Sequence, residues 1–132
     1  MRPYDKAHQL LIMARKDLKS ALTLAKAEEM DAEAVGFHIQ QAAEKALKMW
    51  LELLGVIYPK THDLSLLLGE LEDRGEDVER FWSLIELNPF AVEFRYSIYE
   101  EADFDWEDVY HQVVQLVDHV ESLFLNKEKL DS

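Results

Sequence analysis

The chain has 132 residues, of which 48% are hydrophobic and 31% charged, a composition typical of one globular domain. It has no cysteine, which excludes disulfides, thiolate catalysis and cysteine-based metal sites. The formal net charge is −13, because residues 61–132 carry 19 acids against five lysines and arginines. A field of this sign repels polyanions, so nucleic-acid binding is disfavoured. Four glycines and three prolines are too few for a turn-rich β fold, and we expect an all-α protein.

The first 55 residues predict two amphipathic helices that pair antiparallel across a short connection. Asp31 is a suitable N-cap for the second helix, and Gly55 is suited to follow its last residue. The first helix carries apolar residues at steps of three and four: Tyr4, Ala7, Leu11, Ala14, Leu18, Ala21, Leu22 and Ala25. The second carries Val35, Ile39, Ala42, Ala46, Met49 and Leu53. The facing alanines would let the two backbones approach closely.

A third helix is expected after the loop 55–63, with Thr61 or His62 as its cap and Gly75 at its end. Its apolar residues are Leu64, Leu67, Leu68 and Leu71. Asp77 would then cap a short helix whose apolar residues are Val78, Phe81, Trp82 and Ile85. The pair Asn88–Pro89 predicts the start of another short helix, from Phe90 to about Tyr96.

Asp105 is the expected cap of the last helix, at the end of a stretch with six acids in nine residues, 100–108. The apolar positions of this helix are Trp106, Tyr110, Val113, Val117, Val120 and Phe124. The predicted fold is an up-and-down helical bundle of four main helices plus one or two short ones, forming one domain over residues 1–132. No apolar run is long enough to cross a membrane, and the start does not resemble a signal peptide. We therefore expect a cytoplasmic location.

Three segments carry a family resemblance. They are Phe37-His38-Ile39-Gln40-Gln41-Ala42-Ala43-Glu44-Lys45-Ala46-Leu47-Lys48, Lys60-Thr61-His62-Asp63-Leu64 and Asn88-Pro89-Phe90-Ala91-Val92-Glu93-Phe94-Arg95-Tyr96. Together they resemble a HEPN domain (higher eukaryotes and prokaryotes nucleotide-binding), over about Tyr4 to Phe124. The resemblance implies a helical bundle that is commonly a prokaryotic homodimer. Many members are metal-independent ribonucleases, some of them toxins of toxin–antitoxin pairs, whose motif is an arginine followed after four to six residues by a histidine.

Arg95 matches the arginine of that motif, but the positions of the histidine hold Glu100, Glu101 and Ala102. The chain is therefore more similar to the branch without the motif, whose members often accompany a minimal nucleotidyltransferase and bind a nucleotide or present a substrate. This branch implies a non-catalytic protein with no catalytic residue and no cofactor. Two alternatives stay open. One is a degenerate ribonuclease toxin that uses Arg95 with Glu100 or Glu101, and the other is an oligomer with a purely structural role.

The candidate ligand-binding residues are Lys45, Lys60, His62, Arg95 and Tyr96. Lys60 and His62 lie beside a helix start, where free N–H groups favour phosphate. Lys45 lies with His38, Gln41 and Lys48 along one side of the second helix, and the alternative for this strip is an ordinary solvent face or a dimer surface. Arg95 is expected to contact either a phosphate or a carboxylate such as Glu44 or Asp63.

Two further groups of side chains are more simply explained without a ligand. Arg15, Lys16, Lys19 and Lys26 form a basic run on the first helix, which is expected to be solvated or to pair with the acidic second half of the chain. His111 and His119 lie eight residues apart on the last helix, but no zinc-binding spacing accompanies them. We expect no metal and interpret both histidines as surface residues.

Overall fold

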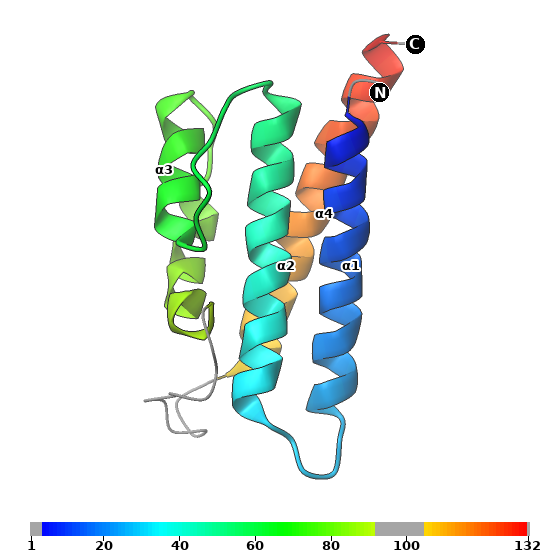
Figure 1. The fold of residues 1–132 in the computed structure, drawn as a ribbon, viewed down its shortest axis with the longest axis vertical. Coiled ribbons are helices and arrows are strands. Elements are labelled where there is room, and N and C mark those ends of the chain that lie inside the picture. Colours follow the sequence, from blue (N-terminus) through cyan, green and yellow to red (C-terminus); the bar gives the residue numbers. More distant parts are fainter. Residues whose placement is uncertain (1–3, 92–104, 132) are drawn as a thin grey trace.

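The computed structural model describes residues 4–91 and 105–131. Its elements are α1 (Asp5–Ala25), α2 (Ala32–Leu53), α3 (Leu64–Asp73), the 3-10 helix η1 (Glu79–Phe90) and α4 (Trp106–Asp131). Helix α2 contacts all the other described helices, with α1 and α4 on one side and α3 on the other (Figure 1). The predicted all-α helical bundle is confirmed. None of the helices in the described ranges is long and apolar enough to span a bilayer.

Helices α1 and α2 form the predicted antiparallel pair, and they share the most extensive contact in the described fold. The alanines that line their apolar stripes are at most 1% exposed: Ala7, Ala14, Ala21, Ala42 and Ala46. Their small methyl side chains let the two backbones approach closely. Asp31 caps α2 as predicted, and its Oδ1 accepts hydrogen bonds from the N–H groups of Glu33 at 3.0 Å and Ala34 at 3.2 Å.

Helices α2 and α3 also end where the sequence predicted, just before a glycine. Gly55 and Gly75 each stand one residue beyond the helix cap, with φ of 70° and 83°. This left-handed conformation carries no steric penalty for glycine, which explains why the helices end there.

The start of α3 corrects the predicted cap. Asp63, rather than Thr61 or His62, is the N-cap, and its Oδ1 accepts hydrogen bonds from the N–H of Ser65 at 2.9 Å and its hydroxyl at 2.7 Å. A carboxylate accepts two donors at once and also favours the positive end of the helix dipole. Thr61 supports this turn, because its Oγ1 accepts a hydrogen bond from the Asp63 N–H. The hydrogen bonds from Ser65 lower the pKa of the Asp63 carboxyl.

The helix after Asp77 differs from the prediction in its periodicity. The buried residues recur every three positions: Val78, Phe81, Leu84, Leu87 and Phe90. The predicted positions Trp82 and Ile85 are only half-buried and 41% exposed, respectively. A 3-10 helix has three residues per turn, so every third residue faces the core, whereas the prediction assumed an α-helix.

Asn88–Pro89 does not begin a new helix, because η1 runs through both residues to Phe90. The Asn88 side chain instead caps α3. Its Oδ1 accepts a hydrogen bond from the Leu64 N–H at 2.9 Å, and its Nδ2 donates to Asp63 Oδ1 at 2.9 Å. Asn88 thus acts as a helix cap, as the sequence predicted, but it caps α3 and not a new helix that begins at Pro89. Residues 92–96 of the predicted segment lie outside the described residues.

The Asn88 contact predicts a specific charge effect on stability. Asn88→Asp keeps an acceptor for Leu64 but replaces the donor to Asp63 with a second carboxylate, so we expect a loss of about 1–2 kcal/mol. Asn126→Asp, at an exposed position of α4, is the matched control and should change stability by less than about 0.5 kcal/mol. Urea unfolding near neutral pH measures both values. Equal stability of the two variants would contradict the assigned role of Asn88.

The last helix packs as predicted, with Asp105 at its start. Asp105 Oδ1 accepts a hydrogen bond from the Asp108 N–H at 3.2 Å. Of the predicted apolar positions, Val113, Val117, Val120 and Phe124 are buried, while Trp106 and Tyr110 are half-buried.

The basic run of α1 is partly paired with the acidic half of the chain. Arg15 bridges α1 to α4 by donating to Asp118 Oδ1 at 2.8 Å and to Glu121 Oε1 at 2.7 Å. Burial lowers the pKa of Arg15, but these two hydrogen bonds outweigh burial and the net shift is upward. Among the described residues, Lys16, Lys19 and Lys26 are exposed and form no ion pair.

Candidate functional site

The polar side of α2 is organised around one buried carboxylate, Glu44, whose side chain is 5% exposed. Three groups donate hydrogen bonds to it: Lys48 Nζ at 2.8 Å, His62 Nδ1 at 2.9 Å and Gln40 Nε2 at 3.2 Å. Gln40 is fully buried, and its Nε2 also donates to the backbone carbonyl of His62 at 3.0 Å. The network therefore fastens the loop before α3 to the middle of α2.

The charge state of Glu44 follows from these contacts. Burial raises the pKa of the carboxyl, but the hydrogen bonds from Lys48 and His62 outweigh it and hold the pKa below its ordinary value. Glu44 is therefore ionised at neutral pH. Its negative charge is compensated locally by Lys48, and a protonated His62 would add to this compensation.

A second cluster joins α2 to α1 through Asp17. Its Oδ1 lies 3.0 Å from His38 Nδ1, and its Oδ2 accepts a hydrogen bond from Lys45 Nζ. The side chains of Asp17 and Lys45 are 14% and 18% exposed. The strip of His38, Gln41, Lys45 and Lys48 is thus a set of interhelical and local contacts on one side of α2. Gln41 belongs to it through a hydrogen bond from its Nε2 to Gln40 Oε1 at 2.7 Å.

Two candidate ligand-binding residues lie in the loop before α3. His62 is 63% exposed although its Nδ1 contacts Glu44, and Lys60 is exposed, with no ion pair among the described residues. The N–H groups of Leu64 and Ser65 donate to Asn88 and Asp63. A phosphate bound here would therefore be held by side chains rather than by these two backbone donors.

The remaining candidates, Arg95 and Tyr96, lie outside the described residues, as do Glu100, Glu101 and Ala102 of the motif positions. Glu44 and Asp63, which were expected as possible partners of Arg95, already have partners. Glu44 contacts Lys48 and His62, and Asp63 contacts Ser65 and Asn88.

Sequence reasoning did not identify Gln40 and Glu44 as the buried centre of this face, although the signal was present. The two residues continue, at steps of four and three, into Leu47 and Leu51, which are fully buried. A glutamine and a glutamate in phase with core leucines indicate a buried polar pair that needs partners.

The histidines of α4 differ in their surroundings. His119 is half-buried against two aromatic rings, with ring centroids 5.0 Å from Trp50 and 6.1 Å from Phe81, so its interpretation as a surface residue was incomplete. Burial lowers the pKa of His119, and the positive charge of Arg80 lowers it further. His111 is exposed. Within residues 4–91 and 105–131, no three histidines or acids are grouped to hold a metal ion.

The lowered pKa of His119 predicts a pH-dependent stability. The folded protein binds the proton of His119 less readily than the unfolded chain, so this contribution is fully present above about pH 6.5 and is lost as the pH falls through the folded-state pKa. We expect His119→Gln to lose less stability than the wild type between about pH 7 and pH 5. His111→Gln is the control and should keep the wild-type slope in thermal unfolding. The same slope in all three proteins would contradict this assignment.

Comparisons with known proteins identify the family. The family model described as HEPN domain matches residues 7–126, which is most of the chain. Searches of curated proteins and of solved structures found no match. The matched range includes all of α2, α3 and η1 and most of α1 and α4, together with both polar clusters on α2. This chain therefore belongs to the HEPN domain family.

Proposed function

We propose that this HEPN domain is a non-catalytic subunit that accompanies a minimal nucleotidyltransferase and binds a nucleotide or presents the substrate. The observation that carries the proposal is the absence of histidine at the positions separated from Arg95 by four to six residues, which hold Glu100, Glu101 and Ala102. Cleavage of RNA without a metal needs a general acid or base that titrates near neutral pH, the role for which histidine is suited. The carboxylates of Glu100 and Glu101 would instead repel the phosphate.

The electrostatics of the described site support a small ligand over a polynucleotide. Lys45 and Lys48 are paired with Asp17 and Glu44, so their charges are already compensated. Lys60, which has no ion pair among the described residues, and the exposed ring of His62 are the groups left for a ligand in this loop. Two such groups suit the phosphates of one nucleotide, whereas RNA binding rests on many uncompensated lysines and arginines.

Native mass spectrometry with and without ATP tests the nucleotide-binding part. We expect a homodimer that carries one nucleotide per chain, and we expect Lys60→Ala to lose it. Lys26→Ala, which removes an exposed lysine at the C-cap of α1, is the matched control and should bind like the wild type. A dimer that never carries nucleotide would contradict nucleotide binding, and a native pull-down without a nucleotidyltransferase would contradict the partnership.

The non-catalytic assignment has its own test. The purified protein, freed of any bound partner, should leave RNA intact, and Arg95→Ala should behave identically. RNA cleavage by the wild type that disappears in Arg95→Ala would overturn the assignment and favour the degenerate ribonuclease.

A further inference from the structure

The two ring nitrogens of His62 have different surroundings. Nδ1 contacts the Glu44 carboxylate at 2.9 Å, and that carboxylate belongs to a side chain that is only 5% exposed. The His62 side chain itself is 63% exposed. Because Nε2 lies across the ring from Nδ1, it is turned away from Glu44 and is the ring nitrogen left for a ligand.

The contact with Glu44 decides which nitrogen carries the proton of a neutral ring. Burial raises the pKa of Glu44, but the hydrogen bonds from Lys48 and His62 outweigh it, so the carboxyl is ionised at neutral pH. An ionised carboxylate only accepts hydrogen bonds, so Nδ1 has to donate. A neutral imidazole carries one N–H, and Nε2 therefore presents a lone pair. Gln40 also holds this residue, because its Nε2 donates to the His62 carbonyl at 3.0 Å.

The charged groups around His62 balance one another while its ring is neutral. Glu44 and Lys48 of α2 form an ion pair at 2.8 Å. Asp63, at the start of α3, adds a negative charge, and Lys60 in the same loop adds a positive one. A proton on Nε2 would give the loop the net positive charge that favours an anion.

We propose that Glu44 is a positioning residue that fixes the Nδ1–H tautomer of His62, so that a phosphate group binds at this loop together with a proton on Nε2. The inference rests on the proposed nucleotide binding. A lone pair on Nε2 repels the oxygens of a phosphate, whereas a protonated Nε2 donates a charge-assisted hydrogen bond to them. Lys60 supplies the second positive charge. The affinity for a nucleotide should therefore rise as the pH falls.

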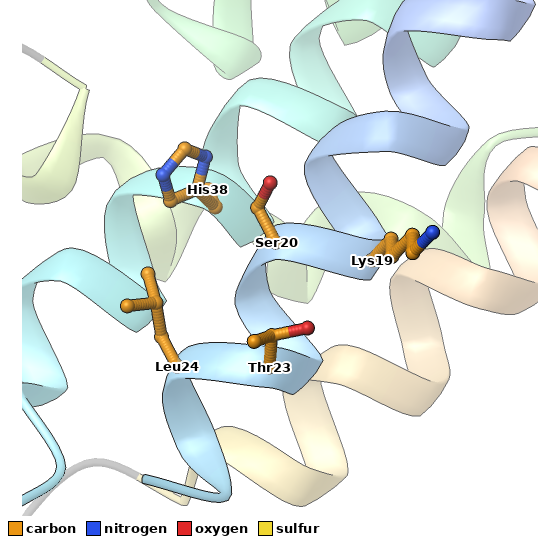
Figure 2. A pocket seen from close by; sticks show the side chains of 5 residues that line it. All are labelled: Lys19, Ser20, Thr23, Leu24 and His38. Atoms are coloured by element: carbon orange, nitrogen blue, oxygen red, sulfur yellow. The ribbon is translucent and has the colours of Figure 1, made fainter.

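His38 provides an internal comparison. Its Nδ1 also lies against a carboxylate, 3.0 Å from Asp17 Oδ1, and Asp17 is shared with Lys45. Figure 2 shows that Lys19 and Thr23 of α1 turn their polar ends away from the His38 ring. No unpaired lysine in the described part of the chain is therefore directed at this histidine. We expect His38 to show the same tautomer as His62 without a response to nucleotide.

The tautomer can be tested without any ligand. Proton–nitrogen correlation spectra of the histidine rings in the full chain, at about pH 8, distinguish a protonated Nδ1 from a protonated Nε2. We expect Nδ1–H for His62, whose signals are identified by their loss in His62→Gln. His111 is exposed and lies against the Tyr110 ring, and it should show signals averaged over both tautomers.

Proton uptake on binding of ATP tests the second half of the proposal. Titration calorimetry in two buffers of different ionisation enthalpy counts the protons taken up, and we expect up to about one per ATP for the wild type near pH 7.5. His62→Gln should abolish this uptake, while His111→Gln should keep it. Between about pH 6 and pH 8, the advantage of the wild type over His62→Gln should shrink roughly three- to tenfold. Glu44→Gln should lose part of the uptake, because an amide can donate to Nδ1 and leave the proton on Nε2.

The outcomes separate this proposal from the proposed function. An Nε2–H tautomer of His62 in the free protein, or equal proton uptake in the wild type and His62→Gln, would overturn the proposal while nucleotide binding stands. Failure of ATP to bind would contradict both nucleotide binding and its link to a proton. The tautomer would then decide alone whether Glu44 positions His62. Circular dichroism checks that every variant is folded.

Discussion

Replacing Gly36 with alanine should destabilise the protein by about 2 kcal/mol, although the same change at an unobstructed helix position adds stability. Gly36 lies inside α2, and a Cβ built there would stand 2.5 to 2.7 Å from Cδ1, Cε1 and Cγ of Phe90. These atoms include the base of the ring, so the ring cannot avoid the methyl group by moving its far edge alone. Phe90 is 4% exposed and would have to leave its place in the core.

Gly69 in α3 provides the matched control, because a Cβ there meets nothing within 4 Å. Gly69→Ala should therefore raise stability by up to about 1 kcal/mol, the ordinary difference in helix propensity. Urea unfolding of both variants measures the contrast. In a Phe90→Leu background, Gly36→Ala should become nearly harmless, because the smaller side chain leaves room for the methyl group. Equal stability of Gly36→Ala and Gly69→Ala would show that Phe90 does not constrain this position.

The contact between Gly36 and Phe90 also bears on the candidate site. It fixes the end of η1 against α2, one residue before Ala91, the last described residue ahead of the segment that contains Arg95. Asn88 fixes the same end of η1 to the start of α3. The end of η1 that precedes that segment is therefore anchored on two helices. Variants of Gly36 and Asn88 should accordingly be assayed for ligand binding as well as for stability.

The α-helices could be predicted from the sequence because their cores follow the helical period. Ala7, Ala14 and Ala21 on α1 recur at steps of seven residues, and Gly55 and Gly75 mark where α2 and α3 end. Helix η1 was predicted less well because its burial follows three residues per turn, a period that a short segment does not distinguish from 3.6. Asn88 was misassigned for a different reason. Its capping preference is local, but its acceptor caps a helix 24 residues earlier in the chain.

The polar strip on α2 was predictable as a set of positions, but its charge balance was not. The spacing of His38, Gln41, Lys45 and Lys48 places them on one side of a helix, whatever the rest of the fold. Of the carboxylates that pair with the two lysines, only Glu44, the partner of Lys48, lies on α2 itself. Asp17 comes from α1, 28 residues before Lys45. Tertiary packing therefore decided which cations are paired and which, such as Lys60, remain exposed. Arg95 and Tyr96 remain predictions.

Glu44→Gln should lower stability by about 2–3 kcal/mol, at the lower end of the cost of breaking a buried ion pair. The substitution keeps the shape of the side chain but removes the charge that Lys48 and His62 face, and it puts an amide where only an acceptor fits. The loss stays moderate because Lys48 is 18% exposed and His62 63% exposed, so both can turn to water. Glu70→Gln removes a carboxylate that is 33% exposed and pairs with Arg74 at 3.6 Å, and it should cost less than about 0.5 kcal/mol.

The pH dependence gives a second measure of Glu44. Since its pKa is lowered in the folded protein, its contribution is fully present above the ordinary value of 4.5 and is lost as the pH falls through the folded-state pKa. The difference in stability between wild type and Glu44→Gln should therefore shrink on acidification below about pH 4.5. An unchanging difference down to acidic pH would show that the cost lies in shape rather than charge. A wild-type affinity for ATP in a folded Glu44→Gln protein would further show that Glu44 holds the loop of Lys60 and His62 for stability alone.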